Sequence, residues 1–334
     1  MMDEQQRQFA LSLLAYGVQR GVSAERLCQL AGIDLDALKK KNNTTISAKQ
    51  VADLWKNASL LCDDPLFGLH FGESLQLAAL GAVGEIIKSS ETVGEAVRIA
   101  ASFTPAVTSL FIMDVKKHQK SFSIQLIPTS FNQDDFTARQ FADLLMVFTV
   151  HEMNGFVLEK IHPETVQYPY KLSNIKEYER VLRCKPVTKK SNYTLEFSNR
   201  YWGEPILTAN YEVQQLLLQK VNQSSTEGTP ASIELQVKVM DYLMKNSYLG
   251  ILSLEDVAGN FNMSPRSLQR RLQEESVTFQ QLADSVRKSL AIHYLESGKH
   301  QIKEISAILG YNELSAFSRA FKRWTGKAPL EYQG

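Results

Sequence analysis

The sequence predicts an α+β domain, with helices on a small antiparallel sheet, followed by an all-α domain with two helix-turn-helix units joined by a long helix. Three observations support this prediction. The chain has 334 residues, which is enough for two separate cores. Residues 222–230 contain no apolar side chain and are typical of a linker. Beyond this segment, one helical pattern of apolar residues occurs twice.

The composition is that of an ordinary globular protein, with 44% apolar and 22% charged residues. No apolar run approaches the roughly 20 residues that cross a bilayer, and the first residues are polar, unlike a secretory signal. The three cysteines, Cys28, Cys62 and Cys184, include no pair at the C-x-x-C spacing of metal sites. These features predict a cytoplasmic protein with reduced thiols and with no membrane segment, metal or cofactor.

Residues 5–61 have the apolar spacing of several short helices. We expect Ser47 to cap the last of them, which runs through residue 58. Residues 22–38 faintly resemble a helix-turn-helix, but Asp34 and Asp36 would repel phosphate, so we interpret this segment as a structural helix pair. The apolar stripe of the first helix consists of Phe9, Leu13, Leu14, Tyr16 and Val18.

The rest of the first domain alternates between helix and strand patterns. Further helices are predicted at 81–88, 92–103, 136–156, 178–182 and 211–221. Strands are predicted at 107–115, 121–127, 160–168 and 193–197. The loop at 116–120 would join the first two strands as a hairpin. We therefore expect helices packed on a small antiparallel sheet.

Residues 302–332 carry a helix-turn-helix pattern. Gly310 suits the left-handed end of a short helix that starts at Ile302, and Asn312 is the expected N-cap of the next helix. On that next helix, one face carries apolar residues and the other carries polar or basic residues. The apolar face consists of Leu314, Phe317, Phe321 and Trp324, and the opposite face of Ser315, Arg319 and Lys322.

An earlier helix-turn-helix pattern, at 254–274, repeats this arrangement. The apolar positions of its first helix lie 48 residues before their counterparts, and those of its second helix lie 49 residues before. The one inserted residue therefore falls in the turn, where length varies most easily. Ser264 is the expected cap of the second helix, and Pro265 its first residue. The apolar positions are Leu254, Val257, Phe261, Leu268 and Leu272.

Residues 279–296, between the two patterns, are predicted to form one helix. At 1.5 Å per residue, this helix would be about 27 Å long. A rod of that length can hold two helices about 34 Å apart, which is one turn of B-DNA. We therefore expect one chain to read two successive major grooves. The apolar side of the helix predicted at 279–296 consists of Phe279, Leu282, Val286, Leu290 and Tyr294.

Bulk charge does not decide whether the second domain binds DNA. Residues 231–334 hold 13 Lys and Arg against 11 Asp and Glu, and the chain has a net charge of +1. The prediction of DNA binding therefore depends on where the arginines lie. A weakly positive domain also predicts modest non-specific binding, so dimerisation or base contacts must supply much of the affinity.

The candidate base readers are outward-facing residues of the second helix in each unit, because Arg can read guanine and Gln can read adenine in the major groove. They are Arg266, Ser267, Gln269 and Arg270 in the first unit, and Glu313, Ser315, Ala316 and Arg319 in the second. We expect the second unit to discriminate less, because Ser and Ala are short. The candidates for phosphate contact or helix capping are Ser264, Arg271, Asn312, Lys322, Arg323 and Lys327. The alternative, a solvated face of a helical interaction module, is disfavoured by the repeat.

The second helix-turn-helix pattern, at 302–332, resembles the C-terminal signature of the AraC/XylS family of bacterial transcriptional regulators. The matching residues are Gly310-Tyr311, 317–323, Gly326, Pro329 and Tyr332. Residues 64–69, Gly81 and residues 92–98 resemble a sensor domain called "arabinose-binding" in one subgroup of that family.

This resemblance implies a sensing and dimerisation domain at 1–221, a linker at 222–230 and a DNA-binding domain at 231–334. The implied function is transcription activation under the control of an unidentified small-molecule effector. The implied partners are promoter DNA, RNA polymerase and a second copy of the chain.

Two other functions stay open: a constitutive regulator whose N-terminal domain only dimerises, and an enzyme fused to a DNA reader. The sequence disfavours an enzyme, because Gly155 replaces the second histidine of the H-E-x-x-H pattern that begins at His151. The adjacent carboxylates at 63–64 and 134–135 are interpreted as solvated turns. No effector-binding residue can be assigned. Core packing is favoured over a pocket for the large residues Phe67, Phe103, Phe111, Phe141, Phe148 and Tyr168.

Overall fold

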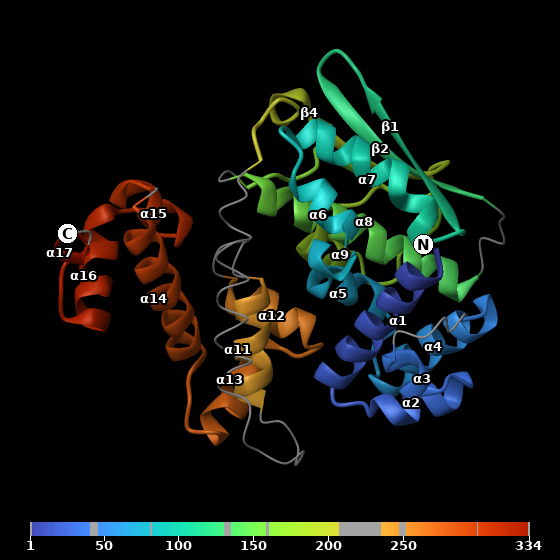
Figure 1. Cartoon of the computed structure of the whole chain (residues 1–334), viewed down its shortest axis with the longest axis horizontal. Helices are drawn as coiled ribbons and strands as arrows, with labels where there is room; N and C mark the ends of the chain where they lie inside the picture. Colours follow the sequence, from blue (N-terminus) through green and yellow to red (C-terminus); the bar gives the residue numbers. More distant parts are fainter. Residues whose placement is uncertain are drawn as a thin grey trace. The chain divides into compact units, whose positions relative to one another are not determined.

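A computed structural model describes residues 2–40, 46–80, 82–129, 135–157, 160–206, 235–246, 252–298 and 300–332. The chain divides into two compact units, Met1–Leu207 and Thr208–Gly334 (Figure 1). The helix predicted at 211–221 and the linker predicted at 222–230 lie outside the described residues. Two units of different class are present, as predicted, and the exact domain boundary stays a prediction.

The first unit begins with helices and continues with helices and strands in alternation. Its helices are α1 (Met2–Gln19), α2 (Ala24–Ala31), α3 (Leu35–Lys39), α4 (Ala48–Leu61), α5 (Phe67–Ser74), α6 (Ala82–Lys88), α7 (Val93–Val107), α8 (Phe136–Phe156) and α9 (Ile175–Leu182). Two short 3-10 helices are η1 (Leu77–Leu80) and η2 (Asn199–Tyr201). The strands are β1 (Phe111–Lys117), β2 (Ser121–Pro128), β3 (Thr165–Gln167) and β4 (Tyr193–Ser198).

The four strands form one antiparallel sheet in the order β1-β2-β4-β3, which confirms the predicted α+β class. Phe111 of β1 lies opposite Pro128 of β2, and Ser121 of β2 lies opposite Ser198 of β4. Helix α7 packs against β1 (Figure 1). The β1–β2 hairpin turns after Lys117, where the His118 amide donates to the Ser121 carbonyl at 2.8 Å.

Helix α8 is the centre of the first unit, and it has the predicted bounds. It is buried on nearly every side, so its neighbours must approach closely. A Cβ on Gly68 of α5 would lie 2.1 Å from the Gln140 carbonyl oxygen of α8, which only glycine avoids. The Gly68 amide instead donates to the Gln140 side chain at 2.5 Å. Glycines in the 64–72 segment thus permit a close α5–α8 contact.

Three details of the first unit differ from the prediction. Helix α7 continues through Val107, where a strand was expected to begin, because the helix packs along β1 rather than joining the sheet. The strand expected at 160–168 is limited to Thr165–Gln167, which pair with β4. Val18 is exposed although it was assigned to the apolar stripe of α1, because its direction on the last turn points away from the core. The other four stripe residues are buried: Phe9, Leu13, Leu14 and Tyr16.

The second unit is all-α in the described residues. Its helices are α11 (Leu235–Lys245), α12 (Leu254–Asn260), α13 (Pro265–Glu274), α14 (Phe279–Ser297), α15 (Ile302–Ile308), α16 (Leu314–Thr325) and α17 (Pro329–Tyr332). In Figure 1 the α12–α13 pair and the α15–α16 pair lie toward opposite ends of α14. This arrangement confirms two helix-turn-helix units joined by a long helix.

Candidate nucleic-acid interface

The first helix-turn-helix unit consists of α12, a tight turn and α13. Ser253 and Asp256 form a capping box at the start of α12. Asn262 adopts a left-handed conformation with φ 53°, and its amide donates to the Gly259 carbonyl at 2.8 Å. The Met263 amide donates to the Ala258 carbonyl at 2.8 Å, which closes the helix end. This turn reverses the chain directly into α13.

The second unit repeats this turn 48 residues later. Gly310 has φ +78°, and its amide donates to the Ala307 carbonyl at 3.0 Å. The Tyr311 amide donates to the Ser306 carbonyl at 3.0 Å. Each donor and acceptor in this turn lies 48 residues after its counterpart in the first unit. The internal repeat predicted from apolar spacing therefore extends to the backbone hydrogen bonds of the turn.

The two units differ where the second helix begins. Ser264 caps α13 as predicted, and its hydroxyl accepts from the Ser267 amide at 3.1 Å. In α16 the N-cap position is held by Glu313, whose side chain makes no capping bond. The prediction that Asn312 caps α16 is therefore wrong: the extra turn residue moves the start of the helix one position along. Leu314 is also not part of the apolar face, since it is 43% exposed on the first turn of α16.

Helix α14 is a single unbroken helix of 19 residues, about 28 Å long. A capping box of Thr278 and Gln281 starts it, and left-handed Gly298 ends it. Leu282, Val286 and Leu290 are buried, and α14 packs against α11, α15, α16 and α17. These three residues belong to the same buried cluster as Leu268 of α13 and Phe317 of α16. The predicted strut is therefore present, and both units share its core.

The outward face of α13 has the predicted composition. Leu268 and Leu272 are fully buried, whereas Arg266, Gln269 and Arg270 are exposed. Arg270 forms an exposed ion pair with Glu274 at 2.9 Å, one helical turn further along. Ser267 is half-buried, and its hydroxyl lies 2.9 Å from that of Ser264. Arg266 and Gln269 therefore offer exposed hydrogen-bonding groups on the outward face of α13.

The outward face of α16 carries Ser315, Arg319 and Lys322, which are all exposed, with Ala316 half-buried beside them. Arg319 lies 49 residues after Arg270 and so occupies the same place on its helix. The counterpart of Glu274 on α16 is Arg323, which means that Arg319 has no acidic residue one turn further along. Phe317 and Phe321 are fully buried on the other side.

Two hollows of the surface border these outward faces. One, of about 550 Å³, is lined by Gln269 and Gln273 of α13 and by the start of α14. The other, of about 360 Å³, is lined by Ala316 and Arg319 of α16 and by the same part of α14. Gln280 and Arg287 of α14 line both hollows. The outward faces of α13 and α16 therefore open toward a shared side of α14.

The predicted phosphate contacts are in different environments. Arg323 forms an ion pair with Asp284 of α14 at 3.2 Å, and Asp284 also pairs with Arg287 at 3.1 Å. Arg323 thus ties α16 to α14 in the free protein. The exposed Arg271 has only the Met263 sulfur within 4.0 Å as a hydrogen-bond partner in the described structure. Lys322 and Lys327 are exposed at the end of α16 and just beyond it.

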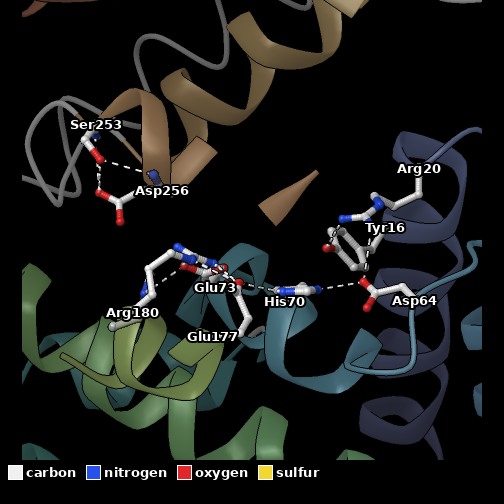
Figure 2. A network of polar contacts seen from close by, with 10 residues as sticks. Tyr16, Arg20, Asp64, His70, Glu73, Glu177, Arg180, Ser253 and Asp256 are labelled. Atoms are coloured by element: carbon white, nitrogen blue, oxygen red, sulfur yellow. Dashed lines mark hydrogen bonds and ion pairs between the residues drawn. The ribbon is translucent and has the colours of Figure 1, made fainter. Parts of the chain in front are cut away.

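A network of buried and half-buried charged side chains crosses the first unit, and sequence spacing does not predict it (Figure 2). His70 of α5 lies 2.7 Å from Asp64 and 2.9 Å from Glu177 of α9. Asp64 also pairs at 3.1 Å with Arg20, which directly follows α1. The interpretation of residues 63–64 as a solvated turn is wrong for Asp64, which is 1% exposed, because Arg20 and His70 neutralise it.

The charged network continues from Glu177 to Arg180 at 2.7 Å and from Arg180 to Glu73 at 2.8 Å. Burial opposes protonation of His70, but its hydrogen bonds to Asp64 and Glu177 outweigh burial and raise the pKa of the imidazole to about 9. Burial opposes ionisation of Glu177, yet the hydrogen bonds from His70 and Arg180 lower its pKa to about 2. Positive and negative groups therefore alternate along this network, which links the segment just after α1 to α5 and α9.

The first unit also contains a cavity of about 70 Å³ between α6, α7 and α8. Of the six large residues considered as pocket candidates, Phe103 and Phe148 line this cavity. The other four, Phe67, Phe111, Phe141 and Tyr168, are buried in the core, as favoured by the sequence. Within the described residues, no cluster of His, Cys, Asp or Glu could hold a metal ion, and no helix could span a membrane.

Comparison with known proteins agrees with this architecture. Residues 21–206 match the family described as "Arabinose-binding domain of AraC transcription regulator, N-term". The chain belongs to the AraC family of transcription regulators. Residues 257–334 match a family described as "Helix-turn-helix domain". The chain is thus a DNA-binding regulator rather than an enzyme.

The relatives of this AraC-family chain are also regulators. It is 26% identical to the "Ornithine utilization regulator" of Pseudomonas aeruginosa, over 97% of this chain and 95% of that protein. It is 23% identical to "HTH-type transcriptional regulator VirS" of Mycobacterium tuberculosis, over 81% of this chain and 79% of that protein. The solved structure of transcriptional regulator CdpR from Pseudomonas aeruginosa matches 92% of this chain and 96% of that chain, with 21% identity and a TM-score of 0.41.

Proposed function

We propose that this regulator activates transcription by binding promoter DNA as a homodimer, under the control of a small molecule held in the first unit. One observation carries the DNA half of the proposal. The outward faces of α13 and α16 border hollows that share Gln280 and Arg287, so both open toward one side of α14. A strut of about 28 Å suits two helices that enter successive major grooves.

Within this proposal, the residues have unequal roles. Arg266, Gln269 and Arg270 read base edges from α13, with Ser267 supporting the first turn beside them. Arg319 is the main reader of α16, with Glu313, Ser315 and Ala316 making smaller contacts near its start. Phosphate contacts come from Arg271, Lys322 and Lys327 and from the start of α13 at Ser264. Arg323 orients α16 through Asp284 and reaches phosphate only if that ion pair opens.

One observation supports regulation by an effector, and a second supports activation. The first unit contains an apolar cavity, which is where a small molecule would bind. Two partial relatives from Escherichia coli are named activators: FapR is 27% identical over 134 residues and PerA is 28% identical over 115 residues. An activator that responds to an effector would contact RNA polymerase at its promoter and shift between two conformational populations.

The DNA half is tested at one pair of equivalent positions, Arg266 of α13 and Ser315 of α16. An operator is first selected from random DNA, and binding of the full chain is then measured by fluorescence anisotropy at fixed salt. Arg266→Ala should weaken binding about 5- to 150-fold, which corresponds to about 1–3 kcal/mol, and relax the preference at one base pair. Ser315→Ala should change affinity little. Equal effects of the two substitutions would contradict the assigned roles.

The regulatory half is tested with a promoter fusion in the bacterial host. The response to added metabolites is compared between the full chain and residues 231–334 alone. We expect the shortened chain to lose the response while still binding the operator, more weakly because the dimerisation domain is absent. An unchanged response under every inducing condition would show that the first unit does not sense an effector.

A further inference from the structure

The cavity of the first unit has almost entirely apolar walls. It lies where α1, η1, α6, α7, β1 and α8 converge. Its volume is about 70 Å³, and six of its lining residues show its character: Val83, Ile87, Val97, Phe103, Leu144 and Phe148. An apolar cavity of about 150 Å³ accepts benzene, so the present one suits a slimmer molecule.

The three polar residues at the wall have their hydrogen-bonding groups already engaged within the protein. The Thr104 hydroxyl donates to the Ala100 carbonyl at 3.1 Å, and the Thr149 hydroxyl donates to the Leu145 carbonyl at 2.8 Å. The Glu152 carboxylate accepts from the Leu77 amide at 3.1 Å. Neither threonine therefore has a hydroxyl hydrogen left for a ligand.

These walls disfavour a sugar. Each sugar hydroxyl that entered without a partner would lose its hydrogen bonds to water and gain none in return. They also disfavour an anion, because the residues that line the cavity include no Lys, Arg or His to pair with it. An alkyl chain loses no hydrogen bond on entry and gains about 0.8 kcal/mol for each buried methylene group.

We infer that the effector is a slender, neutral, apolar molecule, such as an alkyl chain with a single uncharged polar end, rather than a sugar or an amino acid. This inference rests on the proposed regulation by the first unit and specifies its ligand. Such a chain would touch α6, α7 and α8 together. Its binding would therefore fix the position of α6 and α7 on the central helix α8.

The test titrates the full chain with straight-chain alcohols from methanol to octanol and, as polar probes, with L-arabinose and L-ornithine. Binding is followed by calorimetry and thermal shift. Each added methylene should tighten binding by up to about fourfold, from about 0.8 kcal/mol per group, until the cavity is full. The heat-capacity change on binding should be negative, as expected for apolar burial.

Two variants locate the binding site. Ala100 lines the cavity, so Ala100→Leu should fill it and weaken alcohol binding at least about tenfold, by the steric cost of overpacking. Ser102→Leu, on the exposed side of the same helix, is the matched control and should bind as the original chain does. Phe103→Ala enlarges the cavity and should move the preference toward longer alcohols, which also covers the case in which Ala100→Leu does not fold.

Three results would overturn this inference: no binding of any alcohol, binding of the polar probes alone, or alcohol binding that Ala100→Leu and Phe103→Ala leave unchanged. None of them would refute effector control itself. That control fails only if removal of the first unit leaves the promoter response unchanged. The two outcomes are therefore distinguishable.

Discussion

The two helix-turn-helix units have nearly the same interior and different exteriors. Both reverse the chain at a left-handed residue, Asn262 or Gly310, with the same pair of backbone hydrogen bonds. Their outward faces differ, because α13 presents two arginines and two glutamines while α16 presents one arginine, one lysine and small residues. The comparison teaches that core packing and surface chemistry depend on separate sets of positions on the same helices.

The largest effects are expected at the interior positions that the units share. Phe317→Ala should destabilise the second helix-turn-helix unit by about 3–5 kcal/mol. Leu268→Ala, at the equivalent place in the first helix-turn-helix unit, should cost about 2–5 kcal/mol. Both residues are fully buried, so each substitution leaves a cavity. Hydrogen exchange of α13 and α16 amides in the full chain would measure both losses. Protection that stays at its original level in α16 of Phe317→Ala would show that this core is not shared.

Buried charged side chains distinguish the N-terminal domain from the domain that contains the two helix-turn-helix units. In the described residues, the helix-turn-helix domain buries only uncharged polar side chains, such as Asn246, Asn260 and Ser306, whereas the N-terminal domain buries the charged network around His70. The pKa of His70 is raised from 6.5 to about 9, so its stabilising contribution is complete below pH 6.5 and is lost as the pH rises through 9. The loss is on the order of 3 kcal/mol.

Denaturation of the N-terminal domain should therefore become easier between pH 6.5 and 9, while that of the helix-turn-helix domain should change little. Domain-resolved hydrogen exchange at a series of pH values measures this difference. His70→Gln is the control: it should remove most of the pH dependence in this range. If the N-terminal domain were equally stable at both ends of this pH range, His70 would have to be neutral in the folded protein.

A smaller effect is expected at the left-handed turn residues. Gly310→Ala should destabilise the second helix-turn-helix unit by about 1–2 kcal/mol, because a Cβ is disfavoured at φ +78°. Open space surrounds the Gly310 position, so no steric clash adds to that cost. Asn262→Gly should leave the stability of the first helix-turn-helix unit unchanged or slightly raised. Urea denaturation of the full chain distinguishes these results, and equal destabilisation by both substitutions would mean that the two turns are not equivalent.

The smallest effects are expected at the helix caps. Ser264→Ala should cost about 1 kcal/mol, because it removes the hydroxyl that accepts from the Ser267 amide. Glu313→Ser should instead stabilise α16 by about 0.5–1 kcal/mol, since Glu313 makes no capping bond. Thermal denaturation measures both changes. A loss of stability in Glu313→Ser would reveal an interaction of Glu313 that the free protein depends on.

The sequence was sufficient for features that depend on local spacing. The bounds of α8, the continuity of α14 and both helix-turn-helix turns were predicted from apolar periodicity and from Gly310. The prediction failed for Asn312, because spacing alone does not decide which of two turn residues becomes the N-cap. The start of β1 was misplaced because Val107 and Thr108 favour a strand, while packing against the sheet extends α7 to Val107.

Features that join distant parts of the chain could not be predicted from one sequence. Asp64 looked like a solvated turn residue, and only the fold brings Arg20 and His70 to it. The cavity likewise combines residues from six elements, so Phe103 and Phe148 could not be separated from core residues by sequence pattern. The exposed faces of α13 and α16 were easier to predict because each set of residues lies on one helix, where local periodicity is sufficient.

The central claim, two unequal readers held one DNA turn apart by α14, is tested most directly by changing the operator. Half a helical turn of DNA is inserted between the two parts of a selected operator, and the affinity of the full chain is measured. Because α14 is rigid, we predict that the insertion lowers affinity to the level of the Arg319→Ala variant on the original operator, since α16 then faces the wrong side of the DNA. Undiminished affinity for the lengthened operator would contradict the account.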